Sequence, residues 1–128
     1  MNPRIDIDHF KAINDSFGHT EGDLILKKLG LLLRDYGRAS DIIARYGGEE
    51  FLILLAGATE TEAVLTAKRL HQLIGEIKVD NLPLTVSIGV SFAKCLPDLT
   101  YDILFERADA ALYKAKTGGR NQTIVLPV

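Results

Sequence analysis

The sequence lacks several features that would place it in a special class of proteins. Its 128 residues include one cysteine, Cys95, and no tryptophan. A single cysteine excludes an internal disulfide, so we expect a reducing compartment such as the cytoplasm. No apolar run approaches the roughly 20 residues of a membrane-spanning helix, and no signal-peptide pattern opens the chain. We therefore expect a soluble domain that makes no membrane contact of its own.

A large excess of charge of one sign is also absent. The net charge is −2, so no strong field favours binding to a nucleic acid, and an anionic ligand would have to be held by local groups. The composition, 47% hydrophobic and 25% charged, is typical of a globular protein. A chain of this length suits one domain that buries roughly two thirds of its unfolded surface and folds without disulfide or metal staples.

Hydrophobic periodicity predicts helices and strands in alternation. Apolar residues recur at helical spacing in segments that we expect to be helices, at residues 9–17, 24–36, 60–77 and 101–116. Alternating apolar residues predict strands at residues 4–6, 42–46, 51–55, 84–92 and 123–126. We expect Asp8 to cap the first helix, and Thr20 with Asp23 to form a capping box for the second. Gly118 and Gly119 should end the last helix.

The glycine pair between the strands at residues 42–46 and 51–55 predicts a direct β-hairpin. A hairpin within an alternating series favours an α+β fold, with an antiparallel or mixed sheet and helices packed on it. Almost nothing precedes the first strand, so we expect that strand to be cut short and unsuited to the centre of a sheet. No repeat or linker is visible, and residues 1–128 should form a single domain.

Carboxylates gather around the predicted hairpin turn. Glu49 and Glu50 follow the glycine pair and would point to opposite faces of a strand, whereas Asp6 and Asp8 would share a face. Carboxylates that converge from neighbouring strands repel one another unless a cation neutralises them. Mg²⁺ accepts such oxygens together with substrate phosphates, and a glycine turn lets a ligand come close. The alternative is that these acids are solvated residues at the ends of strands and bind no ligand.

These residues belong to a longer set of motifs that resembles the GGDEF family of diguanylate cyclases. The family signature is matched by Gly47, Gly48, Glu49, Glu50 and Phe51, the GGEEF variant. Further motifs follow in the family's order: DIDHFK at 6–11, IND at 13–15, GH at 18–19, GD at 22–23, SIGV at 87–90, ADAALY at 108–113 and KTGGRN at 116–121. Several motifs in one order, spread over nearly the whole chain, are far more specific than one pentapeptide.

The resemblance implies a fold like the palm of nucleotide cyclases and polymerases. It implies an enzyme that joins two GTP molecules into cyclic di-GMP and releases two pyrophosphates. The implied cofactor is Mg²⁺ or Mn²⁺, held by Asp6, Glu49 and the carbonyl of Ile7, with Glu50 close by. The candidate catalytic residues are therefore Asp6, Glu49 and Glu50. The family also implies Glu49 as the base for the ribose 3′-hydroxyl, although a metal-bound glutamate is a weak base.

The resemblance also implies how GTP would be bound. Asn14 and Asp23 would recognise guanine, because an Asp oxygen can accept from its N–H groups and an Asn amide can donate to it. The alternative is that both residues cap helix starts. Leu26, one turn after Asp23, would pack on the base or belong to the core. His19 has no convincing metal partners in the pattern, and we expect it to be structural.

The phosphates of the nucleotide would be bound near the predicted turn and helix ends. Backbone N–H groups at a helix start form a natural phosphate site, and side-chain cations add charge. The candidate phosphate-binding residues are His9, Phe10, Lys11, Gly48, Lys116 and Arg120. For Lys116 and Arg120 the alternative is a role as C-terminal helix charges favoured by the helix dipole.

A second ligand site is implied upstream of the glycine pair. Arg38 and Asp41 resemble the family's RxxD inhibitory site, where the product cyclic di-GMP binds. Arg can donate to guanine O6 and N7, and Asp can accept from its N–H groups. Without a ligand, Arg38 would be a solvated side chain and Asp41 part of a loop.

The family's domain begins earlier than this chain, and its first helices and most of its first strand are not matched here. We interpret the sequence as a diguanylate cyclase catalytic domain that works as a homodimer, in the manner of a cytoplasmic output domain of a larger sensory protein. The main alternative is a receptor that binds cyclic di-GMP or GTP with weak or no catalysis. A third, an α+β interaction domain, requires every motif to be accidental.

Overall fold

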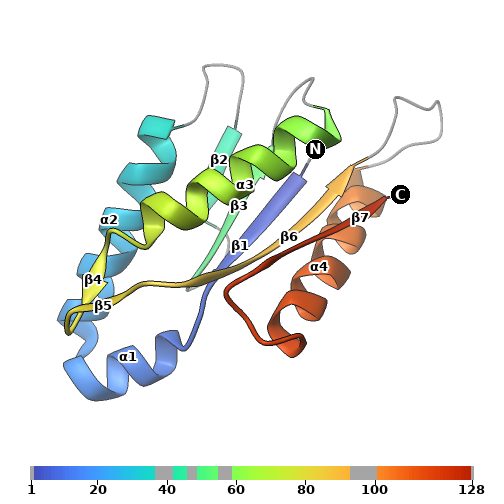
Figure 1. Ribbon diagram of the computed structural model, residues 1–128. Coiled ribbons are helices and arrows are strands. Elements are labelled where there is room, and N and C mark those ends of the chain that lie inside the picture. Colours follow the sequence, from blue (N-terminus) through green and yellow to red (C-terminus); the bar gives the residue numbers. More distant parts are fainter. Residues whose placement is uncertain (1, 37–41, 46–48, 55–58, 93–100, 128) are drawn as a thin grey trace.

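The computed structural model describes residues 2–36, 42–45, 49–54, 59–92 and 101–127. Within them the chain forms a five-stranded sheet with helices packed on it (Figure 1). The strands of this sheet are β1 (Asn2–Ile7), β2 (Ile42–Arg45), β3 (Glu50–Leu54), β6 (Val86–Phe92) and β7 (Thr123–Pro127). The helices are α1 (Phe10–Phe17), α2 (His19–Tyr36), α3 (Glu60–Ile74) and α4 (Tyr101–Thr117), and β4 (Lys78–Val79) pairs with β5 (Leu82–Pro83) in a separate hairpin. Across these ranges no helix is both long and apolar enough to cross a membrane.

The sheet is mixed, as predicted, and its strand order is β2-β3-β1-β6-β7. β1 lies at the centre and pairs antiparallel with β3 on one side and with β6 on the other. β7 runs parallel to β6 at the edge. The prediction that the first strand is too short for the centre is wrong, because its 6 residues all pair with β6 and residues 4–6 also pair with β3.

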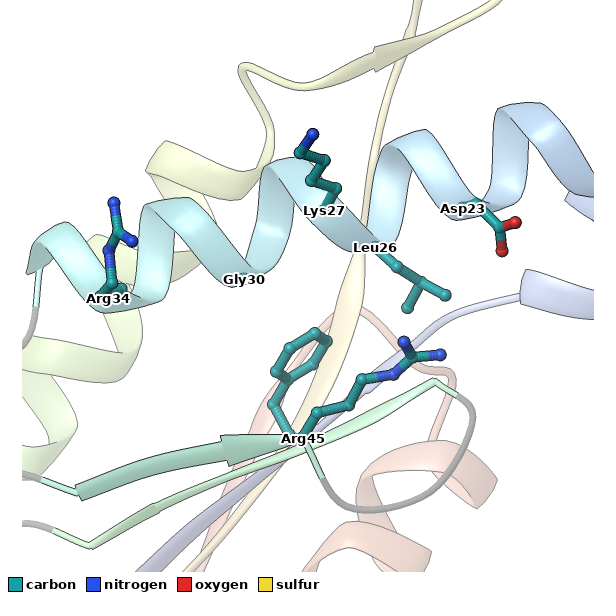
Figure 2. Close-up of a pocket in the computed structure, with 7 residues that line it drawn as sticks. Asp23, Leu26, Lys27, Gly30, Arg34 and Arg45 are labelled. Atoms are coloured by element: carbon teal, nitrogen blue, oxygen red, sulfur yellow. The ribbon is translucent and has the colours of Figure 1, made fainter.

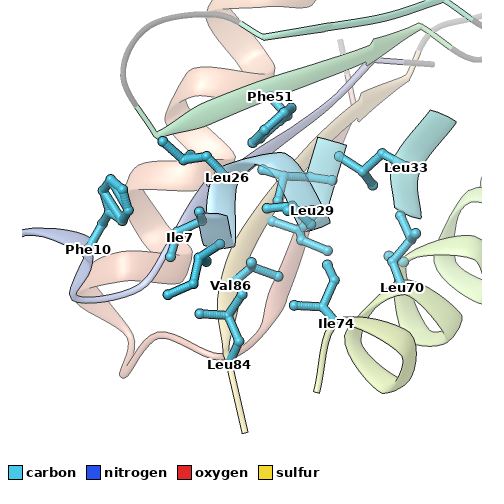
Figure 3. Close-up of a cluster of buried hydrophobic side chains, with 14 of the residues drawn as sticks. Ile7, Phe10, Leu26, Leu29, Leu33, Phe51, Leu70, Ile74, Leu84 and Val86 are labelled. Atoms are coloured by element: carbon cyan, nitrogen blue, oxygen red, sulfur yellow. The ribbon is translucent and has the colours of Figure 1, made fainter. Parts of the chain in front are cut away.

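The hydrophobic core lies between one face of the sheet and the helices α1, α2 and α3. Alternate residues of the two central strands, such as Ile7 and Val86, meet side chains at helical spacing on α2 and α3 (Figure 3). Leu29 and Leu33 of α2 and Ile74 of α3 are at most 1% exposed. This packing holds the start of α1 and α2 against the end of β1.

The opposite face of the sheet is covered by α4, which packs on β6 at very close range. A Cβ atom at Gly89 would overlap the backbone of Ala108 and Leu112 on α4. The residues that α4 turns toward the sheet are small, since Ala108, Ala111 and Ala115 are fully buried. The missing side chain and the alanines bring the end of α4 close to the end of β1.

Several of the predicted helix caps and helix ends are wrong. α2 begins at His19, immediately after Gly18 with its φ of 88°, so Thr20 and Asp23 lie inside the helix and form no capping box. Asp8 caps nothing, because its carboxylate accepts hydrogen bonds from Thr85, Ser87 and the backbone of Asn121. Helical spacing continues to residue 77, yet α3 ends at residue 74 and gives way to the β4–β5 hairpin, which the sequence did not predict.

Candidate active site

The candidate site lies where β1 ends and several chain segments meet. A cavity of about 180 Å³ opens here. Its walls come from the end of β1, the start of α1, the residue before β3 and the end of α4. The lining residues are Asp6, Ile7, Asp8, His9, Phe10, Lys11, Glu49, Lys116 and Arg120. Eight of the predicted catalytic, metal-binding and phosphate-binding residues are therefore brought to one place.

Asp6 carries the strongest electrostatic constraint in this cavity. The residue is 3% exposed, and its Oδ2 lies 2.5 Å from the Nζ of Lys116. Burial raises the pKa of Asp6, and the nearby Glu49 carboxylate raises it further, while the Lys116 ammonium opposes both effects. A cation near Asp6 therefore stabilises the ionised carboxylate.

The donor set fits a hard divalent cation. Asp6 and Glu49 supply carboxylate oxygens to the same cavity, and Ile7 lines it between them. Within the described ranges, no group of three or more His, Cys, Asp or Glu side chains is close enough to form a metal site from the protein alone. This arrangement matches the usual binding of Mg²⁺, which takes one or two carboxylates and fills its coordination with water and substrate phosphates.

Glu50 forms an ion pair with Arg4, although Glu49 and Glu50 both lie close to Asp6. Glu50 lies directly opposite Asp6 in the strand register. Arg4 also pairs with Asp109 of α4, and its guanidinium carbon lies 4.6 Å from the centre of the Phe105 ring. Glu50 is absent from the residues described as lining the cavity, so its position favours a role in holding β1, β3 and α4 together.

A second, larger cavity of about 450 Å³ adjoins the first and contains the predicted base-binding residues. Phe10, Lys11 and Glu49 line both cavities, so the two form one continuous groove. The remaining lining residues are Asn14, Asp15, His19, Asp23, Leu26 and Arg45. His19 is exposed and lines this groove, and the structural role expected for it stays a prediction.

The side-chain amide oxygen of Asn14 is buried beside Gly22. Asn14 lies inside α1 and Asp23 lies inside α2, so neither caps a helix start. The Oδ1 of Asn14 is buried and has no hydrogen-bond partner among the residues that the structure describes. A Cβ atom at Gly22 would overlap this oxygen, so glycine there is what makes room for the Asn14 amide. A buried polar atom without a partner costs free energy, which a ligand that supplies the partner recovers.

Leu26 and Arg45 extend the groove into a third cavity of about 680 Å³ (Figure 2). Leu26 is 6% exposed, so it belongs to the core and also lines the groove. Arg45 ends β2 and points toward Leu26 and Asp23 in Figure 2. The sequence did not predict Arg45 as a site residue, although Arg45 stands two residues before the glycine pair.

The turn after α4 presents the two predicted cations. Lys116 lies in the last turn of α4, but its ammonium reaches Asp6 rather than the helix end alone. Arg120 follows the glycine pair in a left-handed conformation, with a φ of 62°. His9, Phe10 and Lys11, at the start of α1, line the same cavity. Gly48, Arg38 and Asp41 lie outside the described residues.

Comparison with known proteins agrees with this architecture. Residues 4–122 match the family model "Diguanylate cyclase, GGDEF domain". The chain is 42% identical over 123 residues to diguanylate cyclase DosC of Escherichia coli, covering 92% of this chain and 26% of DosC. The chain belongs to the GGDEF diguanylate cyclase family, and it spans about a quarter of the length of that curated relative.

Solved structures of the same family superpose closely on this fold. The GGDEF domain of DgcB from Caulobacter crescentus, in complex with c-di-GMP, matches with a TM-score of 0.87 at 32% identity, covering 97% of this chain and 73% of that one. The active GGEEF domain of a diguanylate cyclase from Vibrio cholerae matches with a TM-score of 0.88 at 36% identity, covering 97% and 80%. The predicted α+β fold is confirmed.

The ion pairs of Arg4 with Glu50 and Asp109, here called the Arg4 network, give a prediction about stability. Arg4→Ala should lower the free energy of unfolding by about 3 kcal/mol, because it leaves Glu50 without its partner in a mostly buried setting. The side chain of Arg4 is 5% exposed and that of Glu50 is 25% exposed. Urea denaturation followed by circular dichroism measures the change.

Arg34→Ala is the matched control. Arg34 pairs with Asp35, but its side chain is 72% exposed, so its loss should change the unfolding free energy by about 0.5 kcal/mol or less. Equal losses in the two variants would show that the Arg4 network contributes nothing beyond an ordinary surface pair.

Proposed function

We propose that this chain is the catalytic domain of a diguanylate cyclase that condenses two GTP molecules into cyclic di-GMP and two pyrophosphates. The observation that carries the proposal is the continuous groove. One end holds Asp6 and Glu49 beside Lys116, and the other holds the buried Asn14 oxygen without a partner. A groove with a place for a cation and phosphates at one end and for a base at the other fits a nucleoside triphosphate.

Asp6, Glu49 and the Ile7 carbonyl would hold Mg²⁺ or Mn²⁺. When bound, the ion supplies Lewis acidity and neutralises charge on the leaving pyrophosphate. The backbone N–H groups at the start of α1, together with Lys116 and Arg120, would bind the phosphates. In the reaction a ribose 3′-oxygen bonds to the α-phosphorus, the bond to pyrophosphate breaks, and the hydroxyl proton passes to a base.

Glu49 is the proposed acceptor of that proton. It lines both cavities, so its carboxylate stands between the predicted phosphate and base positions. Glu50 is assigned a different role from the one expected, since it binds Arg4 and would hold the strand that carries Glu49. Gly48 would leave room for a phosphate at the turn.

Asn14 and Asp23 would select guanine. An Asp oxygen accepts from the N1–H and N2–H groups of guanine, and adenine presents no such pair of donors. The Oδ1 of Asn14 is an acceptor of the same kind. Leu26 would contact the face of the base with apolar surface.

The reaction needs a second nucleotide, whose 3′-hydroxyl attacks the first. One groove of this kind holds one GTP, so we propose that two copies of the chain face each other in a homodimer. The domain would act in the cytoplasm as the output of a larger sensory protein. In DosC the matched part is 26% of the protein.

The first test is product formation with Mg²⁺ and GTP. Glu49→Gln should lower the rate of cyclic di-GMP formation roughly 10²-fold or more, because it removes both a metal ligand and a proton acceptor. Chromatographic detection of cyclic di-GMP measures this. Glu76→Gln, an exposed residue on the loop after α3, is the control and should retain activity. Turnover that survives in Glu49→Gln would exclude the assigned role.

A second prediction concerns base selection. Gly22→Ala places a Cβ where the Asn14 amide lies, so the amide must rotate away. We expect affinity for GTP to fall roughly tenfold, as for a lost buried hydrogen bond, and the preference for GTP over ATP to shrink. Calorimetric titration with both nucleotides measures this.

Gly30→Ala is the matched control in the same helix. A Cβ at Gly30 would lie 3.7 Å from the Phe51 ring, an ordinary contact that leaves Asn14 in place. Both variants gain up to about 1 kcal/mol of helix propensity, so helix propensity does not separate them. Equal GTP affinity in the two variants would argue against the role of Asn14.

A receptor without catalysis is the second candidate function. It is favoured by the structural neighbour DgcB, whose GGDEF domain was crystallised in complex with c-di-GMP. Binding of GTP and cyclic di-GMP by the unmodified chain, with no product formed in the presence of Mg²⁺, would decide for the receptor.

A product site is also proposed, at Arg38 and Asp41. Arg38→Ala should abolish binding of cyclic di-GMP at that site, because the guanidinium is the proposed donor to guanine O6 and N7. Product could also occupy the Asn14–Asp23 end of the groove, and Asp23→Ala should remove that binding while leaving the first. Calorimetry on both variants separates the two sites. Tight binding unaffected by either change would reject both placements.

A further inference from the structure

Asp8 is a buried carboxylate that the proposed mechanism does not use. It follows the last residue of β1 and is 6% exposed. Its Oδ2 accepts hydrogen bonds from the Thr85 hydroxyl at 2.8 Å and from the Asn121 backbone N–H at 2.9 Å. Its Oδ1 accepts from the Ser87 hydroxyl at 2.6 Å, and its own N–H donates to the Thr85 carbonyl at 3.0 Å. One residue therefore ties together the end of β1, the start of β6 and the turn after α4.

The backbone on both sides of this connection is in an uncommon conformation. His9, directly after Asp8, has a φ of 57°, and Arg120 and Asn121 have φ values of 62° and 46°. Residues with a Cβ atom rarely adopt the left-handed region, so such positions persist only where surrounding contacts hold them. The Asp8 carboxylate supplies such a contact, because it accepts from the N–H of Asn121 while its own residue leads into His9.

Two of these strained residues, His9 and Arg120, line the smaller cavity. His9 begins the wall that leads into α1, and Arg120 belongs to the wall that comes from α4. The Arg120 N–H donates to the carbonyl of Ala115, so the turn is tied to α4 on its other side. The position of Arg120 in the cavity therefore depends on a turn that Asp8 anchors.

We propose that Asp8 is a positioning residue, whose carboxylate fixes the turn after α4 so that Arg120 faces the phosphates of the bound nucleotide. The proposal rests on the function proposed above. It differs from a role as a metal ligand, which the nearness of Asp6 would suggest. A carboxylate offers about four lone-pair sites, and three of those on Asp8 are already taken by Thr85, Ser87 and Asn121.

The test compares binding of GTP and GMP, each with Mg²⁺, by calorimetry. Asp8→Ala leaves the Asn121 N–H without its acceptor and frees the turn. We expect GTP affinity to fall roughly tenfold, the size of a lost hydrogen bond to a charged group. GMP lacks the outer phosphates that Arg120 would contact, so its affinity should change less than about twofold. Equal losses for both nucleotides would overturn the proposal.

Asp8→Asn separates positioning from metal binding. Its amide oxygen can accept from Asn121 and Thr85 while its NH₂ donates to Ser87, so it should restore GTP affinity to within about threefold of the unmodified chain. A metal ligand needs the charge, so in that case Asp8→Asn would bind GTP as weakly as Asp8→Ala and would need more Mg²⁺. That result would overturn the proposal.

A double-variant cycle with Arg120→Ala tests the route of the effect. If Asp8 acts through Arg120, the double variant Asp8→Ala with Arg120→Ala should bind GTP no more weakly than Arg120→Ala alone. Additive losses would contradict the proposal. Ser91→Ala is the control for a lost buried hydrogen bond on β6, the strand that carries Ser87, since Ser91 is buried and donates to the Leu104 carbonyl away from the cavity.

A second variant covers the case in which Asp8→Ala does not fold. Asp8→Ser keeps a hydroxyl near Ser87 but is too short to reach the Asn121 N–H, and it should show the same selective loss of GTP affinity. If the unmodified chain binds no GTP, the proposed function fails and the role of Asp8 fails with it. If the unmodified chain binds GTP and the Asp8 variants lose GTP and GMP equally, the role of Asp8 fails alone.

Discussion

The alternation of side chains along β1 is the constraint on which the site depends. Ile5 and Ile7 enter the hydrophobic core on one face of the sheet, so Arg4 and Asp6 must enter the other face, beneath α4. Both are almost fully buried, and a buried charge requires a partner. Asp109 and Lys116 of α4 supply those partners, which couples the placement of one helix to the electrostatics of the groove.

At the end of α4, the pairing of Lys116 with Asp6 therefore depends on the close packing of the helix on the sheet. The ammonium of Lys116 reaches Asp6 only because α4 lies deep against β6, and it lies deep because Gly89 has no side chain where the helix backbone passes. A larger residue at position 89 would lift α4 and with it the cation that offsets the burial of Asp6. The Asp8 carboxylate accepts from the backbone of the turn that follows α4, so the positions of Lys116 and Arg120 both depend on contacts with buried carboxylates.

The sequence predicted what depends on local pattern and failed where distant contacts decide. Alternation at residues 84–92 predicted β6 to within two residues, and helical spacing predicted α4. Asp8 stands where a cap is expected, but its actual donors, Thr85, Ser87 and Asn121, are 77 to 113 residues away, and no local rule contains them. Arg45 was missed for the same reason, because its position in the groove depends on α2 lying across β2.

The charge distribution along the groove gives a bound nucleotide its direction. Asp23 lies at the end where the Asn14 oxygen is buried, and no triphosphate would be placed beside two such acceptors. Lys116 and Arg120 lie at the other end, but so do Asp6 and Glu49. A triphosphate therefore brings further negative charge to a cavity whose three cations, Lys11, Lys116 and Arg120, are already matched by the carboxylates of Asp6, Asp8 and Glu49. The charge that remains is what a divalent cation would neutralise, so the nucleotide and the metal are expected to bind to this site together rather than separately.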